Sequence, residues 1–248
     1  MARRNLPLIE IAPPGYEHRP LVLDLFCGAG GASKGWVDAG YRVIGVDTSP
    51  LMLKRYPWES HLADAVRVLE DLVRFGRSSR IGVKLSDIAV IHASPPCEAY
   101  SATFRIGNSN AEQLIAPVRQ LLEALGVPWV IENVPGARKD MIDPITLCGA
   151  TFPYLLVYRH RLFETSFPVL EPVHQRHAWH QPKMGRPVKP GDYIQVVGNF
   201  SNADYAREAM GICWMGRDQL KEAIPPAYTH YIAGFVVQSK LSPTEGAP

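Results

Sequence analysis

Cys97 is the residue of this chain best placed to act as a nucleophile. It follows the run Ser94, Pro95 and Pro96, and the apolar residues 87–93 before that run are typical of a buried strand. The two prolines stiffen the backbone directly before the thiol. A thiol held at a strand end is reactive when its pKa is lowered, whereas a lone cysteine elsewhere is usually buried and inert. The motif therefore predicts a reactive cysteine.

Glu132 offers a carboxylate in a similar place. It ends a second apolar run at residues 129–132 and is followed by Asn133. If this strand neighbours the strand before Cys97, the acid and the thiol share one pocket. A surface glutamate without a role is the alternative interpretation.

Arg159 and Arg161 flank a single histidine in the letters RHR. Side chains two residues apart point to the same side of an extended segment. Two guanidinium groups in that arrangement suit a phosphate or a carbonyl oxygen. A structural salt bridge is the alternative.

A glycine-rich turn, DLFCGAGG, spans residues 24–31. Such a turn between a strand and a helix lets a ligand approach the backbone and exposes the first amides of the helix. Asp47 ends the next apolar run, about 20 residues further on, where a carboxylate commonly bonds ribose hydroxyls. Capping of the following helix is the alternative role. The chain has no P-loop lysine pattern, which argues against triphosphate chemistry.

Strand and helix patterns alternate along the first half of the chain. Buried strands are predicted at residues 21–26, 41–46, 87–93 and 129–132, with a short strand before residue 63. Helices are predicted from the glycine turn to about Ala39, from Ser49 and Pro50 onward, at 110–125, and at 225–238 as a closing element. This order predicts an α/β fold, a Rossmann-like doubly wound and mostly parallel sheet with helices on both faces. Ligands then bind at the carboxyl ends of the strands.

Composition sets broad limits on the function. The 248 residues are 46% hydrophobic and 20% charged, with a net charge of +2, which neither requires nor excludes nucleic acid. No apolar run has the length of a membrane span or of a signal peptide. The four cysteines form no CxxC pair, so free thiols and a cytoplasmic location are expected; they are Cys27, Cys97, Cys148 and Cys213.

The motifs DLFCGAGG, VD, SPPC, ENV and RHR occur in the order and rough spacing of the DNA (cytosine-5)-methyltransferases. The resemblance covers about residues 21–163 and resumes at 207–235. The chain is most similar to compact phage or prophage members, through RHRLFE and IPPAYTHYIAGF. The resemblance implies a class I S-adenosylmethionine-dependent methyltransferase. It would transfer a methyl group to carbon 5 of a cytosine flipped out of double-stranded DNA.

The resemblance also implies a role for each motif residue. Cys97 would add to carbon 6 of the base, Glu132 would bond its N3 and exocyclic amine, and the arginines Arg159 and Arg161 would face it. Asp47 would hold the ribose of the cofactor, and Asp64 its adenine amino group. The residues expected to bind S-adenosyl-L-methionine are Phe26, Gly28, Ala29, Gly30, Asp47, Thr48, Asp64, Ser94 and Pro96.

Residues 165–205 are predicted to be a small irregular target-recognition region, inserted in a catalytic domain of residues 1–164 and 206–248. Its short length leaves room for few base-edge contacts, so we expect a target of about two to four base pairs. We expect a monomer that binds duplex DNA and no membrane. The predicted DNA contacts are Ser101, Arg176, Lys183, Arg186 and Lys189.

Three histidines recur at every third position of this region, His174, His177 and His180. With Cys148 or Cys213 they would allow a structural zinc ion. The intervening tryptophan, a nearby proline and the lack of a partner cysteine favour histidines that face DNA or solvent instead. The sequence therefore predicts no metal.

The chain departs from the family at three places. Val157 replaces a glutamine before the arginine pair, and Thr48 replaces an aromatic residue, so that Leu51 or Met52 would have to pack on the adenine. A late Gly-Asn pair is replaced by the residues at 221–222. These changes bear on cofactor affinity and on placement of the recognition region more than on the thiol chemistry.

Three other functions fit the same motifs. An RNA cytosine-5 methyltransferase shares the Pro-Pro-Cys and Glu-Asn-Val motifs, but its Cys-Phe-Thr segment is not evident here. A DNA-binding relative without catalysis would not need an intact Cys97 and Glu132. Finally, a modified sulfonium donor would transfer a group other than methyl.

Overall fold

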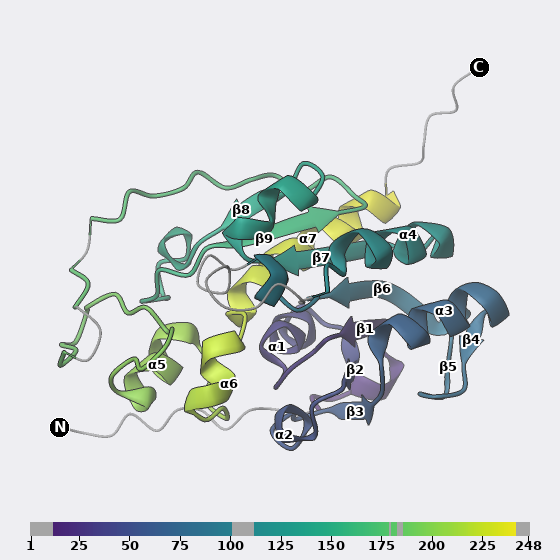
Figure 1. Ribbon diagram of the computed structural model, residues 1–248, viewed down its shortest axis with the longest axis horizontal. Helices are drawn as coiled ribbons and strands as arrows, with labels where there is room; N and C mark the ends of the chain where they lie inside the picture. Colours follow the sequence, from purple (N-terminus) through teal and green to yellow (C-terminus); the bar gives the residue numbers. More distant parts are fainter. Residues whose placement is uncertain (1–11, 101–111, 179, 183–185, 242–248) are drawn as a thin grey trace.

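Seven strands form one central sheet in the order β3-β2-β1-β6-β7-β9-β8 (Figure 1). The computed structural model describes residues 12–100, 112–178, 180–182 and 186–241, and beyond Val236 it describes the backbone only. The strands are β1 (Leu21–Leu25), β2 (Arg42–Asp47), β3 (Glu59–Leu62), β6 (Ile88–Ala93), β7 (Trp129–Asn133), β8 (Ile145–Leu147) and β9 (Arg161–Thr165). The pairs β3-β2, β2-β1, β1-β6 and β6-β7 are parallel, whereas β9 runs antiparallel to β7 and to β8. Two short strands, β4 (Arg77–Ser78) and β5 (Val83–Lys84), form a separate hairpin.

The helices connect these strands across both faces of the sheet. They are α1 (Gly31–Asp38), α2 (Pro50–Leu53), α3 (Ala65–Phe75), α4 (Ile115–Leu125), α5 (Ala203–Met210), α6 (Arg217–Glu222) and α7 (Pro226–Leu241). Short 3-10 helices are η1 (Tyr16–His18), η2 (Leu85–Asp87), η3 (Glu98–Tyr100), η5 (Pro135–Asp140) and η6 (Gly149–Thr151).

The predicted fold class is confirmed: a doubly wound, mostly parallel sheet. Each predicted strand of the first half is present, with bounds that differ by one or two residues. Ser49 caps α2, accepting a hydrogen bond from the amide of Met52, and Pro50 is its first residue, as predicted. The predicted start of the helix at residue 110 lies outside the described residues.

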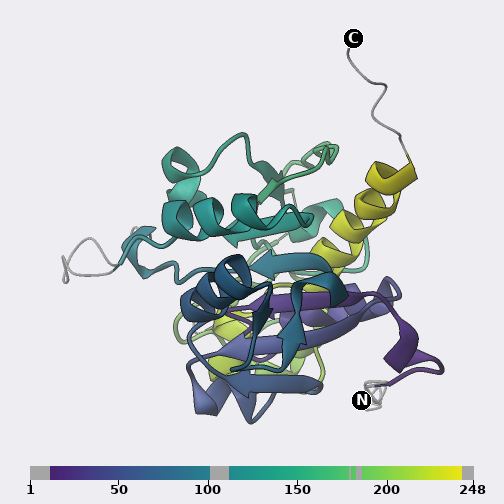
Figure 2. The same cartoon turned by 90° about the vertical axis from the view of Figure 1, so that its right-hand side faces the viewer.

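Successive side chains of each strand point to opposite faces of the sheet, and this alternation divides the core into two layers. Val22, Val90 and Val130 pack on the face covered by α1 and α7. Leu23, Ile91 and Ile131 pack on the opposite face, against α3 and α4. Figure 2 shows the blue α3 beside the teal α4 on this second face. Apolar side chains on both faces explain why these strands are near-continuous hydrophobic runs.

Helix α1 packs tightly against the closing segment because two of its residues are glycines. A Cβ at Gly31 would meet the backbone of Ile224, and one at Gly35 would meet the carbonyl of Pro226 and the hydroxyl of Thr229. The Thr229 hydroxyl donates across this contact to the carbonyl oxygen of Ala32, at 2.7 Å. The segment predicted to close the fold therefore does pack on the core.

The region between β9 and α5 differs from the rest of the molecule. In Figure 1 the chain leaves β9 as a long green connection and returns at α5. Its described residues contain no helix or strand, only an isolated bridge between Val157 and Ile194. The irregular character predicted for this region is confirmed there, whereas its status as a separate domain stays a prediction.

Across the part of the chain that the structure describes, no helix is both long enough and apolar enough to cross a membrane.

Candidate active site

Cys97 and Glu132 lie at the carboxyl ends of neighbouring parallel strands. The pairing of β6 with β7 places Ala93 opposite Ile131, so the loop after β6 and the end of β7 share one edge of the sheet. The side-chain amide of Asn133 donates to the carbonyl oxygen of Pro95 at 3.0 Å and ties that loop to β7. The condition set by the sequence, that these two strands be neighbours, is met.

Arg161 lies opposite the carboxylate on the same edge. Its Nε is 3.0 Å from Oε1 of Glu132, and the two side chains are 15% and 6% exposed. The arginine comes from the start of β9, which pairs antiparallel with β7. No described donor is aligned for a hydrogen bond to Oε1, although this oxygen is fully buried. The charge is thus balanced, although this oxygen accepts no well-aligned hydrogen bond from the described residues.

The Cys97 thiol is exposed at this edge. Desolvation by the surrounding protein raises its pKa, Arg161 lowers the pKa, and Glu132 raises it again. The net shift is upward, so the lowered pKa required by the sequence argument is not found in the free protein. Burial outweighs one nearby guanidinium, and the thiol must lose its proton as part of its activation.

Arg159 is more deeply buried than its partner in the motif. Its terminal nitrogens donate to the carbonyl oxygens of Val196 and Lys221, which joins the recognition region and the end of α6 to this point. Burial, together with the nearby charge of Arg161, lowers its pKa to about 9, so the group still carries its charge at neutral pH. Its Nε is buried without a hydrogen-bond acceptor among the described residues.

The glycine turn forms a strained backbone cradle at the end of β1. Phe26, Gly28 and Gly30 all have positive φ angles, of 56°, 54° and 86°. A phenylalanine rarely adopts such an angle, and strain of this kind gathers at binding sites. Asp47 holds the turn, because its Oδ2 accepts from the amide of Gly28 at 2.9 Å and its Oδ1 accepts from that of Ser49 at 2.8 Å.

The other predicted cofactor residues lie around this turn or beyond it. Ala29 is buried, Thr48 and Pro96 are exposed, and Ser94 is half-buried with a buried hydroxyl that has no described partner. Asp64 is exposed and caps α3, where its Oδ1 accepts from the amide of Val66 at 2.8 Å. Its predicted contact with adenine stays a prediction.

Buried polar atoms without partners gather at this site. Six such side-chain atoms occur among the described residues, and three of them belong to Ser94, Glu132 and Arg159. Leaving a buried donor or acceptor unpaired costs about 1–3 kcal/mol, so such atoms call for an explanation. A polar ligand at the strand ends would supply one.

Only some of the predicted DNA contacts lie among the residues that the structure describes. Arg176, Arg186 and Lys189 are exposed in the recognition region. Ser101 and Lys183 lie outside the described residues. Of the three regularly spaced histidines, His180 pairs with Asp192, its Nδ1 lying 2.8 Å from Oδ1.

Known proteins support the resemblance that the motifs predicted. The curated relative Type II methyltransferase M.XorII of Xanthomonas oryzae pv. oryzae is 27% identical over 122 residues, which cover 48% of this chain and 29% of the relative. This chain thus matches less than a third of that protein's length. No family model matches the chain.

Two solved structures share the fold. One is a prophage-encoded E. coli protein assigned as a DNA modification methyltransferase, with a TM-score of 0.54 and 15% identity, covering 90% of this chain and 99% of its own. The other is S. pombe Dnmt2 methyltransferase, with a TM-score of 0.59 and 13% identity, covering 90% of this chain and 99% of its own. These findings fit the DNA (cytosine-5)-methyltransferase family. At such low identity, the two structures establish the class I methyltransferase fold.

The places where the chain departs from this methyltransferase family also contact the site. Lys221 supplies the carbonyl oxygen that Arg159 binds. Glu222 lies near enough to influence the Cys97 thiol, and its own pKa is raised by desolvation and by Asp47 and Glu98. Sequence reasoning treated these two residues only as a missing Gly-Asn pair. Leu51, proposed as a replacement for the aromatic residue, is 74% exposed and therefore free to cover a ligand.

Proposed function

We propose that this chain transfers a methyl group from S-adenosylmethionine to carbon 5 of cytosine in DNA. The observation that carries the proposal is the arrangement of Cys97, Glu132 and Arg161 at one edge of the sheet, where the buried carboxylate of Glu132 is paired with the guanidinium of Arg161. Activation of a cytosine ring requires a nucleophile, a group that bonds its N3 edge and a cation near its carbonyl oxygen. Cys97, Glu132 and Arg161 would fill these three roles in that order.

Cytosine needs this activation because its carbon 5 is a poor nucleophile. The Cys97 thiol gives its proton to solvent and the thiolate adds to carbon 6. The ring electrons that this addition displaces are stabilised at N3 by a proton that Glu132 takes up from solvent and shares with N3. Carbon 5 then takes the methyl group with the bond electrons left on the donor sulfur. Loss of the carbon-5 proton to solvent and departure of the thiolate restore the aromatic ring. Arg161 stabilises charge on the O2 carbonyl throughout.

Contact between the base and Cys97 requires that the base leave the duplex. Flipping a base out of the stack costs a few kcal/mol, which contacts in the pocket must offset. The carboxylate of Glu132 would offer one such contact, to the exocyclic amine, once the base enters between it and Cys97. The exposed basic residues of the recognition region would hold the phosphate backbone.

The residues around the glycine turn fit the proposed cofactor. The positive φ angles of Phe26, Gly28 and Gly30 would hold the backbone open to a ligand, and Asp47, which accepts from the amide of Gly28, would also accept ribose hydroxyls. When bound, S-adenosylmethionine supplies an electrophilic methyl group on a sulfonium ion. The unpaired Ser94 hydroxyl lies at the end of the next strand and would face the same ligand.

Mass spectrometry of nucleosides tests the proposal directly. The purified chain is incubated with S-adenosylmethionine and either duplex DNA of mixed sequence or transfer RNA. We expect 5-methylcytosine from the DNA only. Product from the RNA only would replace the substrate with RNA, and N4-methylcytosine or no product would contradict the mechanism.

A further inference from the structure

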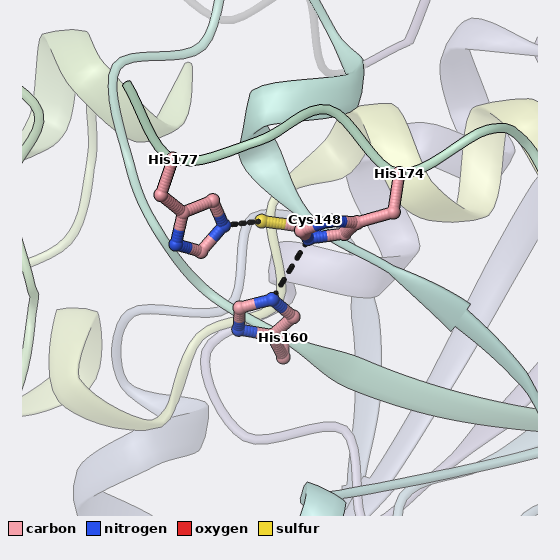
Figure 3. A group of neighbouring side chains, drawn as sticks. All are labelled: Cys148, His160, His174 and His177. Carbon is pink, nitrogen blue, oxygen red and sulfur yellow. Dashed lines mark hydrogen bonds between the residues drawn. The ribbon is translucent and has the colours of Figure 1, made fainter. Parts of the chain in front are cut away.

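Four metal-binding side chains converge at one point outside the proposed active site. Cys148 precedes η6, His160 stands between the two arginines of the RHR motif, and His174 and His177 belong to the recognition region. One ligand atom from each of the four lies within 4.8 Å of the corresponding atoms of the other three. Figure 3 shows the three imidazole rings and the sulfur facing one another.

The spacing of these atoms is close to that of a tetrahedral zinc site. Zinc bonds of about 2.0–2.1 Å to nitrogen and 2.3 Å to sulfur place neighbouring ligand atoms about 3.3–3.6 Å apart. In the structure, Sγ of Cys148 is 3.4 Å from Nε2 of His177, and Nε2 of His160 is 2.9 Å from Nε2 of His174. Small side-chain rotations would therefore bring all four atoms onto one ion.

The donor set selects the class of metal. One thiolate with three imidazoles suits zinc, whereas calcium and magnesium require oxygen ligands. Four protein ligands also fill a tetrahedral ion completely and leave no position for a substrate. That arrangement is typical of a structural site rather than a catalytic one.

The surroundings hold the ligands in place. Cys148 is fully buried, and its sulfur accepts hydrogen bonds from the backbone of Ala150 and Arg159. Tyr158 stacks on the ring of His177 with centroids 3.9 Å apart, and Tyr193 stacks on the other side of Tyr158 at 4.4 Å. Contacts of this kind around the first ligands orient them and tune a metal site.

The stretch of the recognition region that holds His174 and His177 has little packing of its own. Residues 168–178 form no helix or strand and bury no side chain, with Leu170 and Val173 73% and 81% exposed, whereas Ile194, Val196 and Phe200 further along are buried in the core. Short segments that cannot bury a core commonly depend on metals or disulfides.

We propose that Cys148, His160, His174 and His177 bind one zinc ion that fastens the recognition region to the sheet edge. Because His160 lies between Arg159 and Arg161, the ion also fixes the backbone that aims both arginines. The sequence had suggested His180 as a third ligand and favoured no metal; the structure replaces His180 with His160, which is distant in sequence from the other two histidines.

Metal analysis of the full chain, purified without a histidine tag, tests the site. We expect about one zinc ion per chain after dialysis, and close to none in Cys148→Ser and in His174→Ala. The matched controls are Cys213→Ser and His180→Ala, which change the same residue types outside the cluster and should retain the ion. Equal zinc in Cys148→Ser and the unchanged chain would overturn the proposal, as would failure of the apo chain to take up zinc.

Cobalt substitution distinguishes loss of the metal ligand from poor folding of a variant. A cobalt-loaded chain should show a sulfur-to-metal charge-transfer band, which Cys148→Ser should lose while the circular dichroism of the sheet is unchanged. Absence of that band from the cobalt-loaded parent chain would show that the four side chains are only a hydrogen-bonded cluster. Neither readout depends on methyl transfer, so the zinc site can fail while the proposed function stands.

Discussion

The two halves of the proposed site are positioned by different physical means. Cys97 and Glu132 are placed by strand register, since each follows a parallel strand whose neighbour is fixed by continuous backbone hydrogen bonds. The recognition region is placed partly by packing of Ile194, Val196 and Phe200 in the core and partly by single side-chain contacts, such as Arg159 to the carbonyl of Val196 and His177 to Cys148. A chemical site can thus rest on a rigid sheet while the surface beside it depends on a few separate contacts.

This difference predicts how each half responds to mutation. Loss of a side chain at a strand end should remove chemistry and leave the structure intact, because register does not depend on it. Loss of one contact at residues 168–178 should loosen that whole stretch, because none of its side chains is buried. Substitutions at Cys97 and Glu132 test the expected loss of chemistry, and the metal measurements test the expected loosening of the recognition region.

The largest expected effect is that of Cys97→Ala. Methyl transfer should fall by about 10⁴-fold or more, since Cys27, the other thiol that follows a strand at this edge, is buried and covalent activation is lost. Filter binding of duplex DNA and equilibrium dialysis of S-adenosylmethionine should be unchanged, because the side chain is exposed. Cys213→Ser is the matched control and should retain activity; a fully active Cys97→Ala would remove the thiol from the mechanism.

Glu132→Gln should have the next largest effect. The amide keeps the size of the side chain but cannot share a proton with N3, so single-turnover methyl transfer should slow by at least about 10²-fold. Glu123→Gln, on the far side of α4, controls for loss of a carboxylate. A near-normal rate in Glu132→Gln would assign the activation of N3 to another group.

The strand ends were predictable because apolar runs and turn residues are local signals. The apolar runs at 21–26, 87–93 and 129–132 predicted the strands, and the site residues lie at the end of each run or in the loop after it. The antiparallel β8 and β9, the hydrogen bonds of Arg159 and the cluster around Cys148 were not predictable. They depend on pairings between residues far apart in sequence, for which a single sequence carries no local pattern.

Packing of the sheet against its helices should be sensitive to single methyl groups. Gly35→Ala places a Cβ against Pro226 and Thr229 and should destabilise the fold by about 1–3 kcal/mol in urea unfolding. Gly234→Ala, in the partner helix but with open space around it, should instead stabilise by about 0.5–1 kcal/mol. Equal effects of the two changes would contradict the close contact between α1 and α7.

The smallest expected effect concerns the reactivity of the thiol. Because its pKa is raised, alkylation of Cys97 by iodoacetamide should be slow at neutral pH and accelerate as the pH rises toward and beyond 9, the ordinary value of a thiol. Arg161→Gln removes a charge that lowers this pKa and should slow alkylation several-fold at a given pH, whereas Glu132→Gln should accelerate it. The rates are read from the Cys97 peptide by mass spectrometry. Shifts of the same sign in both variants would mean that the two charges do not act on the thiol.

Covalent trapping tests the central claim most directly. Duplexes of randomised sequence, with 5-fluorocytosine in place of cytosine, are incubated with the chain and S-adenosylmethionine, and the products are separated under denaturing conditions. The fluorine cannot leave as a proton does, so an active enzyme should remain bound to the DNA through the Cys97 peptide, and Cys97→Ala should form no adduct. An adduct in Cys97→Ala, or methylation of ordinary DNA by a chain that forms no adduct, would contradict the account.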